Sequence, residues 1–378
     1  MRKGDVALLF GGLVLSLTLG ELALRALAPL PHGPENRGYR TVVKQQLPGL
    51  KREISYERNP YGLRTADSIP GPKSSDVTRI LCIGASTTDQ ATQDLEDTWC
   101  NRLGAGLSRR FDGQQRRFET ASYGRGGYRA VDLLAWAQDS LAPIDPDIVV
   151  VLVGINDLAF VGGAGYRYQG LDSSLANSRA VRGPKSPPSL SLARRLCPDA
   201  LQLCRRLRLL RQGNSDRLEW HSANLPRLRE EYRNLPSVRE PARSPDPAVE
   251  FREGVDSLVG FLQARGIKPV LLSQPTLWSA DASEEEQAVL WFGVHTPAGK
   301  VRPDGAWLSR EMARYDSILE AVALRRAISF LDLAARIPRN LEYFFDDCHF
   351  TDRGSQQVAL ELIGTVAALI GGKAPQVP

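Results

Sequence analysis

The stretch Ile148-Val149-Val150-Val151-Leu152-Val153 decides the fold of this chain. All six side chains are apolar, and isoleucine and valine are enriched in strands. A strand that is apolar on both faces is typical of the centre of a parallel sheet, because helices then cover the sheet on each side. The tetrapeptide Gly154-Ile155-Asn156-Asp157 follows this segment directly.

Strands and helices alternate on either side of this segment. The predicted strands are residues 79–83, 118–122, 148–153, 269–273 and 328–332. The predicted helices are one that Thr98 caps, then residues 131–141, 251–264, 309–325 and 351–370. This alternation predicts an α/β fold in which helices cover a parallel sheet on both faces.

The first thirty residues differ from the rest of the chain. Arg2 and Lys3 precede the largely apolar stretch 6–28, which reaches the roughly 17–25 residues that a membrane anchor needs. We favour an uncleaved anchor, in which Arg2 and Lys3 hold the N-terminus in the cytoplasm and the bulk of the protein lies outside it. A signal peptide cleaved after Ala26-Leu27-Ala28, which would make the protein secreted, and a buried core helix are the alternatives.

The rest of the chain divides into a connecting segment and one large domain. Residues 31–77 lack sustained periodicity and are interpreted as a linker or a strap on the domain surface, with an ordered turn at 59–64. Residues 78–372 would form the domain, and an insertion at about 160–250 interrupts its alternation. A second irregular stretch, residues 277–308, is expected to line a cleft.

The overall composition is that of an ordinary globular protein, with 42% hydrophobic and 24% charged residues. The net charge of +5 is mildly basic, and residues 161–250 alone hold fifteen arginines and one lysine against nine acidic residues. We interpret this insertion as a helical cap with solvated arginines, with contact to anionic lipid headgroups or an acidic polymer as the alternative. Nucleic acid is not an expected partner, because few aromatic residues accompany the basic ones.

The five cysteines fit no dense disulfide framework. Cys82 lies in a predicted core strand and is expected to be inert, while Cys100 and Cys348 are a candidate pair. Cys197 and Cys204 would lie about 10 Å apart on one helix, which is too far for a disulfide. The four histidines have no second ligand at metal spacing, so neither a metal nor a cofactor is expected.

Chemically active side chains follow four of the predicted strands. Ser86 follows the first strand, Gly124 the second and Asn156 the third, and a loop with Asp346 and His349 follows the fifth. The carboxyl ends of parallel strands lie at one edge of the sheet, so these residues are expected to converge. Alone, each motif is typical of a turn, a helix cap or a surface loop, but their joint occurrence favours catalysis.

These residue types suit acyl transfer. His349 would take the proton of Ser86 as general base, and Asp346 would orient the imidazole and stabilise its cation. The backbone N–H groups of Ser86 and Gly124 and the side-chain amide of Asn156 would form an oxyanion hole.

The four motifs together resemble the SGNH, or GDSL-type, hydrolase superfamily, over about residues 78–158 and 250–372. The resemblance implies a flavodoxin-like three-layer α/β/α sandwich with five parallel strands, with Ser86, Asp346 and His349 as the catalytic residues. Two supporting positions differ, since Ala85 replaces the usual aspartate before the nucleophile and Ser122 replaces an asparagine. The turn at 59–64 ahead of an anchored domain looks like membrane-tethered bacterial members, and this resemblance implies a place on the periplasmic side of a bacterial inner membrane.

The leading hypothesis is a serine esterase that cleaves acyl or acetyl esters on a small molecule, glycan or lipid. The Gly-x-Ser-x-Gly elbow of α/β-hydrolases is absent at Ser86, which disfavours that fold. An O-acyltransferase that passes the acyl group to an envelope polysaccharide would use the same residues. A non-catalytic glycan-binding module is the alternative from a different class.

Overall fold

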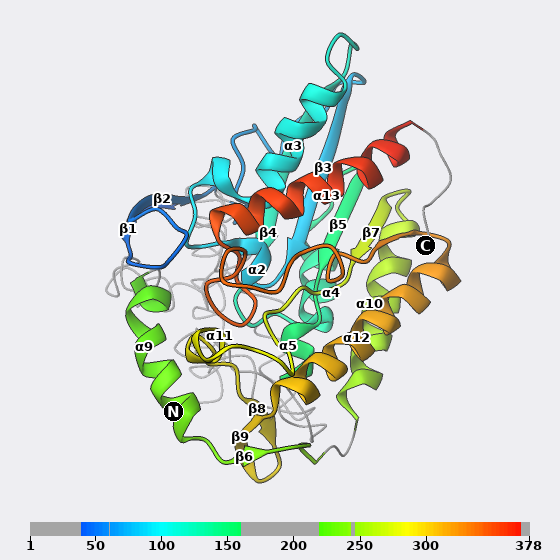
Figure 1. Cartoon of the computed structure of the whole chain (residues 1–378). Coiled ribbons are helices and arrows are strands. Elements are labelled where there is room, and N and C mark those ends of the chain that lie inside the picture. The colour runs from blue at the N-terminus through cyan, green and yellow to red at the C-terminus, as the bar shows by residue number, and fades with distance from the viewer. Residues whose placement is uncertain (1–38, 60, 160–218, 243–245, 372–378) are drawn as a thin grey trace, which may run out of the picture.

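A five-stranded parallel sheet forms the centre of this computed structural model, which describes residues 39–59, 61–159, 219–242 and 246–371. The strand order is β10-β7-β5-β3-β4, and the first and third strands of the domain are neighbours, as in flavodoxin-like sheets (Figure 1). The bounds are β3 Val77–Gly84, β4 Arg117–Gly124, β5 Ile148–Leu152, β7 Lys268–Leu272 and β10 Ser329–Leu331.

Strand β5 is the central strand of the sheet and is buried along its whole length, as its apolar composition predicts. It pairs in parallel with β3 on one side and with β7 on the other. Gly84 at the end of β3 pairs with Gly124 of β4 and with Leu152 of β5, so three strands end side by side.

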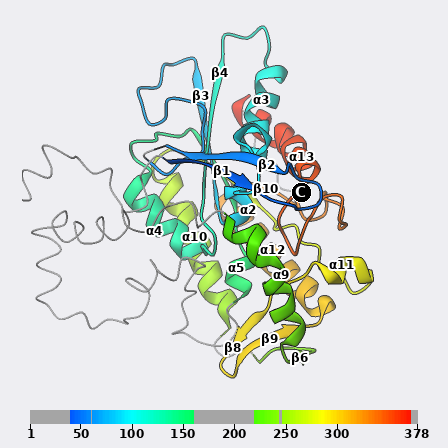
Figure 2. The same cartoon turned by 90° about the vertical axis from the view of Figure 1, so that its left-hand side faces the viewer.

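Helices cover both faces of this sheet (Figure 2). On one face α3 (Trp99–Arg110) packs against α13 (Asp352–Ile370). On the other, α10 (Pro247–Gln263) packs against α4 (Ala130–Ser140) and α12 (Gly305–Arg326). The predicted three-layer α/β/α sandwich is thereby confirmed.

Side-chain caps explain where the helices begin. Thr98 accepts a hydrogen bond from the backbone N–H of Asn101 and caps α3, as the sequence predicts. The last long helix before β10 begins four residues earlier than predicted, because Asp304 accepts from the backbone N–H of Trp307 at 2.8 Å.

Residues 39–77 lie on the domain and include a hairpin that the sequence analysis missed. Strands β1 (Tyr39–Lys44) and β2 (Glu53–Arg58) pair in antiparallel fashion. The expected turn beyond β2 is ordered, since the backbone N–H of Asn59 donates to the carbonyl of Leu63 at 2.8 Å. Arg64 then pairs with Ser122 through two backbone hydrogen bonds of 2.9 Å, which adds the segment to the edge strand β4.

The described part of the insertion contacts the stretch 277–308 through a pair of strands. The insertion supplies α9 (Glu219–Asn234) and β6 (Ser237–Val238), and β6 pairs with β9 (Gly299–Pro303). The stretch 277–308, expected to be irregular, holds α11 (Glu284–Ala288) and the hairpin of β8 (Val294–Thr296) with β9. The helix expected to carry Cys197 and Cys204 lies outside the described residues.

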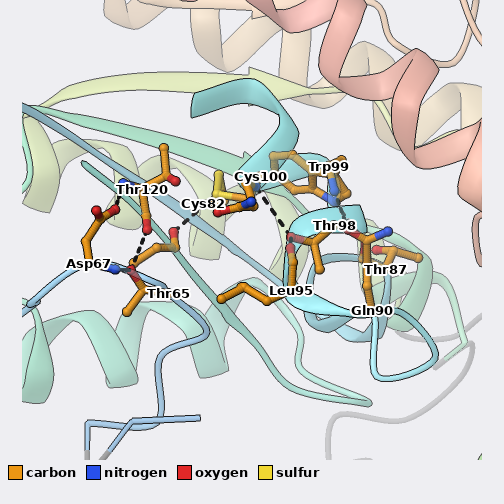
Figure 3. Close-up of a disulfide and its surroundings, with 12 residues drawn as sticks. Thr65, Asp67, Cys82, Thr87, Gln90, Leu95, Thr98, Trp99, Cys100 and Thr120 are labelled. Carbon is orange, nitrogen blue, oxygen red and sulfur yellow. Dashed lines mark hydrogen bonds between the residues drawn. A yellow bond between two sulfur atoms is a disulfide. The ribbon is translucent and has the colours of Figure 1, made fainter. Parts of the chain in front are cut away.

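The predictions for Cys82, Cys100 and Cys348 were wrong. Cys82 and Cys100 form a disulfide (Figure 3), with a Cα–Cα distance of 6.1 Å. Cys348 is a buried free thiol. The reason is that α3, which begins at Trp99, packs on β3, so the first turn of the helix brings Cys100 to the strand residue Cys82.

Within the four described ranges, no helix has both the length and the apolar character that a bilayer crossing requires. The predicted anchor at residues 1–30 lies outside those ranges.

Candidate active site

The predicted residues lie at the carboxyl ends of the strands or in the segments that follow them. Ser86 is the first residue of the short helix α2 (Ser86–Asp89), which follows β3. Asn156 lies in α5 (Ile155–Leu158), which follows β5. Gly124 is the last residue of β4, and Asp346 and His349 lie in the loop between β10 and α13.

Three of these residues form one hydrogen-bonded series. The Nε2 atom of His349 lies 2.8 Å from Oγ of Ser86. Its Nδ1 atom lies 2.8 and 2.9 Å from the two carboxylate oxygens of Asp346. A carboxylate can only accept, so Nδ1 carries the proton of the neutral ring and Nε2 is left to accept from the serine hydroxyl.

Asp346 is a buried carboxylate that several donors hold in place. The backbone N–H groups of Cys348 and His349 donate to Oδ1 at 3.0 and 2.9 Å, and Nε1 of Trp291 donates to Oδ2 at 2.9 Å. Burial alone would raise the pKa of Asp346, but the charge and hydrogen bond of His349, with these donors, lower it below its ordinary value. Asp346 is therefore ionised at neutral pH.

Two aromatic rings lie near the imidazole of His349 and nearly parallel to it. Its centroid is 5.7 Å from that of Phe345 and 6.4 Å from that of Trp291, at interplanar angles of 16° and 6°. Burial opposes the charged ring, but the charge and hydrogen bond of Asp346, with the charges of Asp347 and Asp89, raise the pKa of His349. The ring is thus a stronger base than an exposed histidine.

A second buried carboxylate, Asp347, supports the same loop. It accepts from Nε1 of Trp278 at 2.7 Å and from the backbone N–H groups of Trp291 and Phe292 at 2.8 and 3.1 Å. Burial and the neighbouring charge of Asp346 raise the pKa of Asp347 to about 7. The stretch 277–308 is therefore part of the support of the Asp-His loop.

The insertion also reaches this loop, which the sequence analysis did not predict. Arg229 on α9 donates from Nη2 to the carbonyl of Phe345 and from Nε to the carbonyl of Val289, both at 3.1 Å. It thereby ties the loop before Asp346 to the segment before Trp291. No local pattern distinguishes Arg229 from the other arginines of the insertion.

Of the two further residues predicted for the oxyanion hole, Gly124 lies against the Ser86 loop and Asn156 follows the central strand β5. A Cβ atom at Gly124 would lie 2.1 Å from the backbone nitrogen of Asp89 and 2.6 Å from the carbonyl oxygen of Ala85, so only glycine fits against the Ser86 loop. Nδ2 of Asn156 donates one hydrogen to the carbonyl of Tyr128 at 2.9 Å. An amide nitrogen carries two hydrogens, so this contact accounts for one of them.

Two clusters in the described part of the chain have donor atoms close enough to hold a metal ion. In the first (Asp346, Cys348 and His349), Nδ1 is hydrogen-bonded to Asp346, and burial with the nearby carboxylates raises the pKa of the thiol. In the second (Asp94, Glu96 and Asp97), the ammonium of Lys51 lies 2.9 Å from Asp94 and 2.6 Å from Asp97. Neither set of ligands is suited to a metal as it stands.

Comparison with known proteins identifies the family. No curated protein matches the chain. Among solved structures, an acetyl xylan esterase is 16% identical with a TM-score of 0.41, over 76% of this chain and 99% of the other. An acetylxylan esterase from Geobacillus stearothermophilus is 14% identical with a TM-score of 0.40, over 76% and 93%. A GDSL-like lipase from Bacteroides thetaiotaomicron is 12% identical with a TM-score of 0.38, over 79% and 91%.

The family model of the GDSL-like lipases and acylhydrolases matches residues 82–357, which include all five predicted site residues. The match spans more than half of the chain. The chain therefore belongs to the GDSL-like lipase/acylhydrolase family and is a serine hydrolase that acts on ester bonds.

Proposed function

We propose that this enzyme cleaves carboxylic esters through an acyl-Ser86 intermediate. The observation that carries the proposal is the hydrogen-bonded series from Ser86 through His349 to Asp346. Oγ of Ser86 lies 2.8 Å from Nε2 of His349, and Nδ1 of the same ring lies 2.8 Å from Oδ2 of Asp346. Such a series lets a neutral hydroxyl lose its proton as it attacks.

In the first half-reaction, Oγ of Ser86 attacks the carbonyl carbon of the ester while its proton moves to Nε2 of His349. Asp346 stabilises the imidazolium that forms, without taking the proton itself. The tetrahedral intermediate then collapses, the bond to the alkoxide breaks, and the imidazolium protonates the leaving alcohol. In the second half-reaction, water attacks the acyl-enzyme with the same proton transfers and releases the acid.

The negative oxygen of the tetrahedral intermediate needs preorganised donors. We assign this role to the backbone N–H groups of Ser86 and Gly124 and to the side-chain amide of Asn156. Ser86 is the first residue of α2, where a backbone N–H has no acceptor within the helix. The backbone of Gly124 lies so close to the Ser86 loop that a Cβ atom would not fit there. This closeness supports the N–H group of Gly124 as the second donor.

For the substrate, we propose an acyl or acetyl ester on a glycan or a lipid, met outside the cytoplasm. The support is the apolar segment at residues 6–28 behind Arg2 and Lys3, which suits a membrane anchor. Whether water or a sugar hydroxyl takes the acyl group depends on which one reaches the acyl-enzyme.

The test compares wild type with Ser86→Ala on a chromogenic acetyl ester and on an acetylated oligosaccharide. We expect turnover to be lost in the folded variant, and free acid to exceed transferred acyl for wild type when an unacylated glycan is present. A Ser86→Ala variant with wild-type turnover would refute the mechanism, and predominant transfer would make the enzyme an acyltransferase.

A further inference from the structure

The segment that precedes the family core sends a buried arginine between two parts of the site. The side chain of Arg58, at the end of β2, is 1% exposed. Its Nη2 atom lies 2.6 Å from Oδ1 of Asp89 and 2.7 Å from the carbonyl oxygen of Gly124, and its Nη1 atom lies 2.8 Å from the carbonyl oxygen of Gly62. One guanidinium therefore joins the end of α2, the end of β4 and the turn at Gly62.

Two of these partners belong to the catalytic centre. Asp89 ends the four-residue helix that begins with Ser86, and Gly124 is the proposed oxyanion glycine. The two residues touch, because a Cβ atom at Gly124 would lie 2.1 Å from the backbone nitrogen of Asp89. Arg58 holds the side chain of one and the carbonyl of the other, and so fixes the distance between the nucleophile helix and the end of β4.

A second buried arginine from the same segment holds the chain just after the nucleophile helix. Nη1 of Arg64 donates to the carbonyls of Asp89 and Gln90 at 2.5 and 2.7 Å, and Nη2 donates to the carbonyl of Gln93 at 2.7 Å. Gln90 has a φ of +49°, which a residue with a side chain rarely adopts unless its surroundings impose it. The contacts of Arg64 help to impose it.

We propose that residues 53–59 and 61–64 complete the active site, and that Arg58 is a positioning residue that sets Gly124 against Ser86 for stabilisation of the oxyanion. This segment lies outside the residues 82–357 that match the family model. The inference rests on the proposed function, because it assumes that Ser86 is the nucleophile and Gly124 an oxyanion donor.

An arginine is needed because its planar fork reaches several acceptors in fixed directions, whereas a lysine ammonium is a single point. Tyr56 adds to the same arrangement, since its hydroxyl donates to Oδ1 of Asp89 at 2.7 Å. A displacement of about 1 Å at a catalytic group can lower a rate about 100-fold. We therefore expect Arg58 to act on the transition state more than on substrate affinity.

The chain offers a matched control in Arg79, near the start of β3 and hence at the opposite end of the strand from Ser86. Its side chain is also 1% exposed, pairs with Glu119 at 2.7 Å and donates to the carbonyl of Ile144 at 2.6 Å. Its removal disturbs a buried ion pair of the same kind, away from the catalytic centre.

The experiment measures kcat, KM and the rate of fluorophosphonate labelling for Arg58→Lys, Arg58→Met, Arg79→Lys and Arg79→Met. We expect both Arg58 variants to lose about 10- to 100-fold in kcat and in labelling rate, with KM within about twofold of wild type. The Arg79 variants should lose thermal stability but keep the kcat of the folded protein. Tyr56→Phe, which deletes one hydroxyl, provides a milder test in case the Arg58 variants do not fold, and should lower kcat by several-fold.

The inference is overturned if folded Arg58 variants keep the wild-type kcat, or if only their KM changes. It is also overturned if the Arg79 variants lose as much kcat as the Arg58 variants. If the Arg58 variants do not fold, an unchanged kcat in Tyr56→Phe also overturns the inference. These outcomes differ from a failure of the proposed function, in which Ser86→Ala stays active or wild type is not labelled at Ser86.

Discussion

Replacement of Asp346 by asparagine tests the assignment of the imidazole protons. In the wild type, Oδ1 accepts from two backbone N–H groups, while Oδ2 accepts from Trp291 and lies 2.8 Å from Nδ1 of His349. The asparagine oxygen will take the Oδ1 position, because the backbone donors there need an acceptor. Its NH2 group then takes the Oδ2 position, which is slightly closer to Nδ1 than Oδ1 is (2.8 against 2.9 Å), and favours the form of the ring in which Nδ1 carries no hydrogen and accepts.

The consequence is the wrong tautomer of His349. With hydrogen on Nε2, the ring cannot take the proton of Ser86, which lies 2.8 Å away. We expect Asp346→Asn to lower kcat by about 10⁴-fold, as loss of the orienting carboxylate does in serine proteases. At about 1.36 kcal/mol per tenfold, this is about 5.4 kcal/mol of transition-state stabilisation.

The assay is steady-state hydrolysis of a chromogenic acetyl ester, with Asp347→Asn as the matched control. Asp347 is as buried and also accepts only from N–H donors, but it does not contact the imidazole in this way. Both variants should be less stable, while Asp347→Asn should keep kcat within about tenfold of wild type. A kcat of Asp346→Asn within tenfold of wild type, or equal losses in the two variants, would refute the reasoning.

Three further predictions concern the oxyanion hole, the pH profile and the disulfide. Asn156→Ala should lower kcat by about 10²–10³-fold with little change in KM, and a change in KM alone would make Asn156 a substrate-binding residue. In kcat/KM against pH, activity should appear as His349 loses its proton, above the ordinary histidine pKa of about 6.5. Asp347 has a pKa of about 7, and its ionised form favours the imidazolium, so Asp347→Asn should move this limb to lower pH; a move to higher pH would contradict the assignment. Replacement of Cys82 and Cys100 by serine should lower the free energy of unfolding by about 3 kcal/mol, because the disulfide spans 18 positions, and an unchanged urea midpoint would argue against the bond.

The sheet and the Ser-His-Asp arrangement were predictable because local patterns specify them. The apolar run at 148–153 becomes the central strand β5, and the residues after parallel strands must meet at one edge. The spacing of Asp346 and His349 lets one short loop carry both groups, so their contact needed little knowledge of the rest of the fold.

The supporting residues were not predictable, because each acts at long range from a segment without a strong pattern. Trp291 reaches Asp346 across 55 residues and Arg58 reaches Gly124 across 66. The hairpin of β1 and β2 was missed although the buried Ile54 and Tyr56 alternate with more polar residues along β2, a period-two signal that the prediction did not use. The disulfide of Cys82 with Cys100 depends on how α3 packs over β3, which composition does not indicate.

The nucleophilic role of Ser86 can be measured most directly by covalent labelling. Intact wild-type protein is treated with a serine-directed fluorophosphonate, digested, and its modified peptide identified by mass spectrometry. We predict a single adduct on Ser86, loss of activity in proportion to labelling, and no adduct in Ser86→Ala. An adduct on another residue, or full activity after complete labelling of Ser86, would contradict the account.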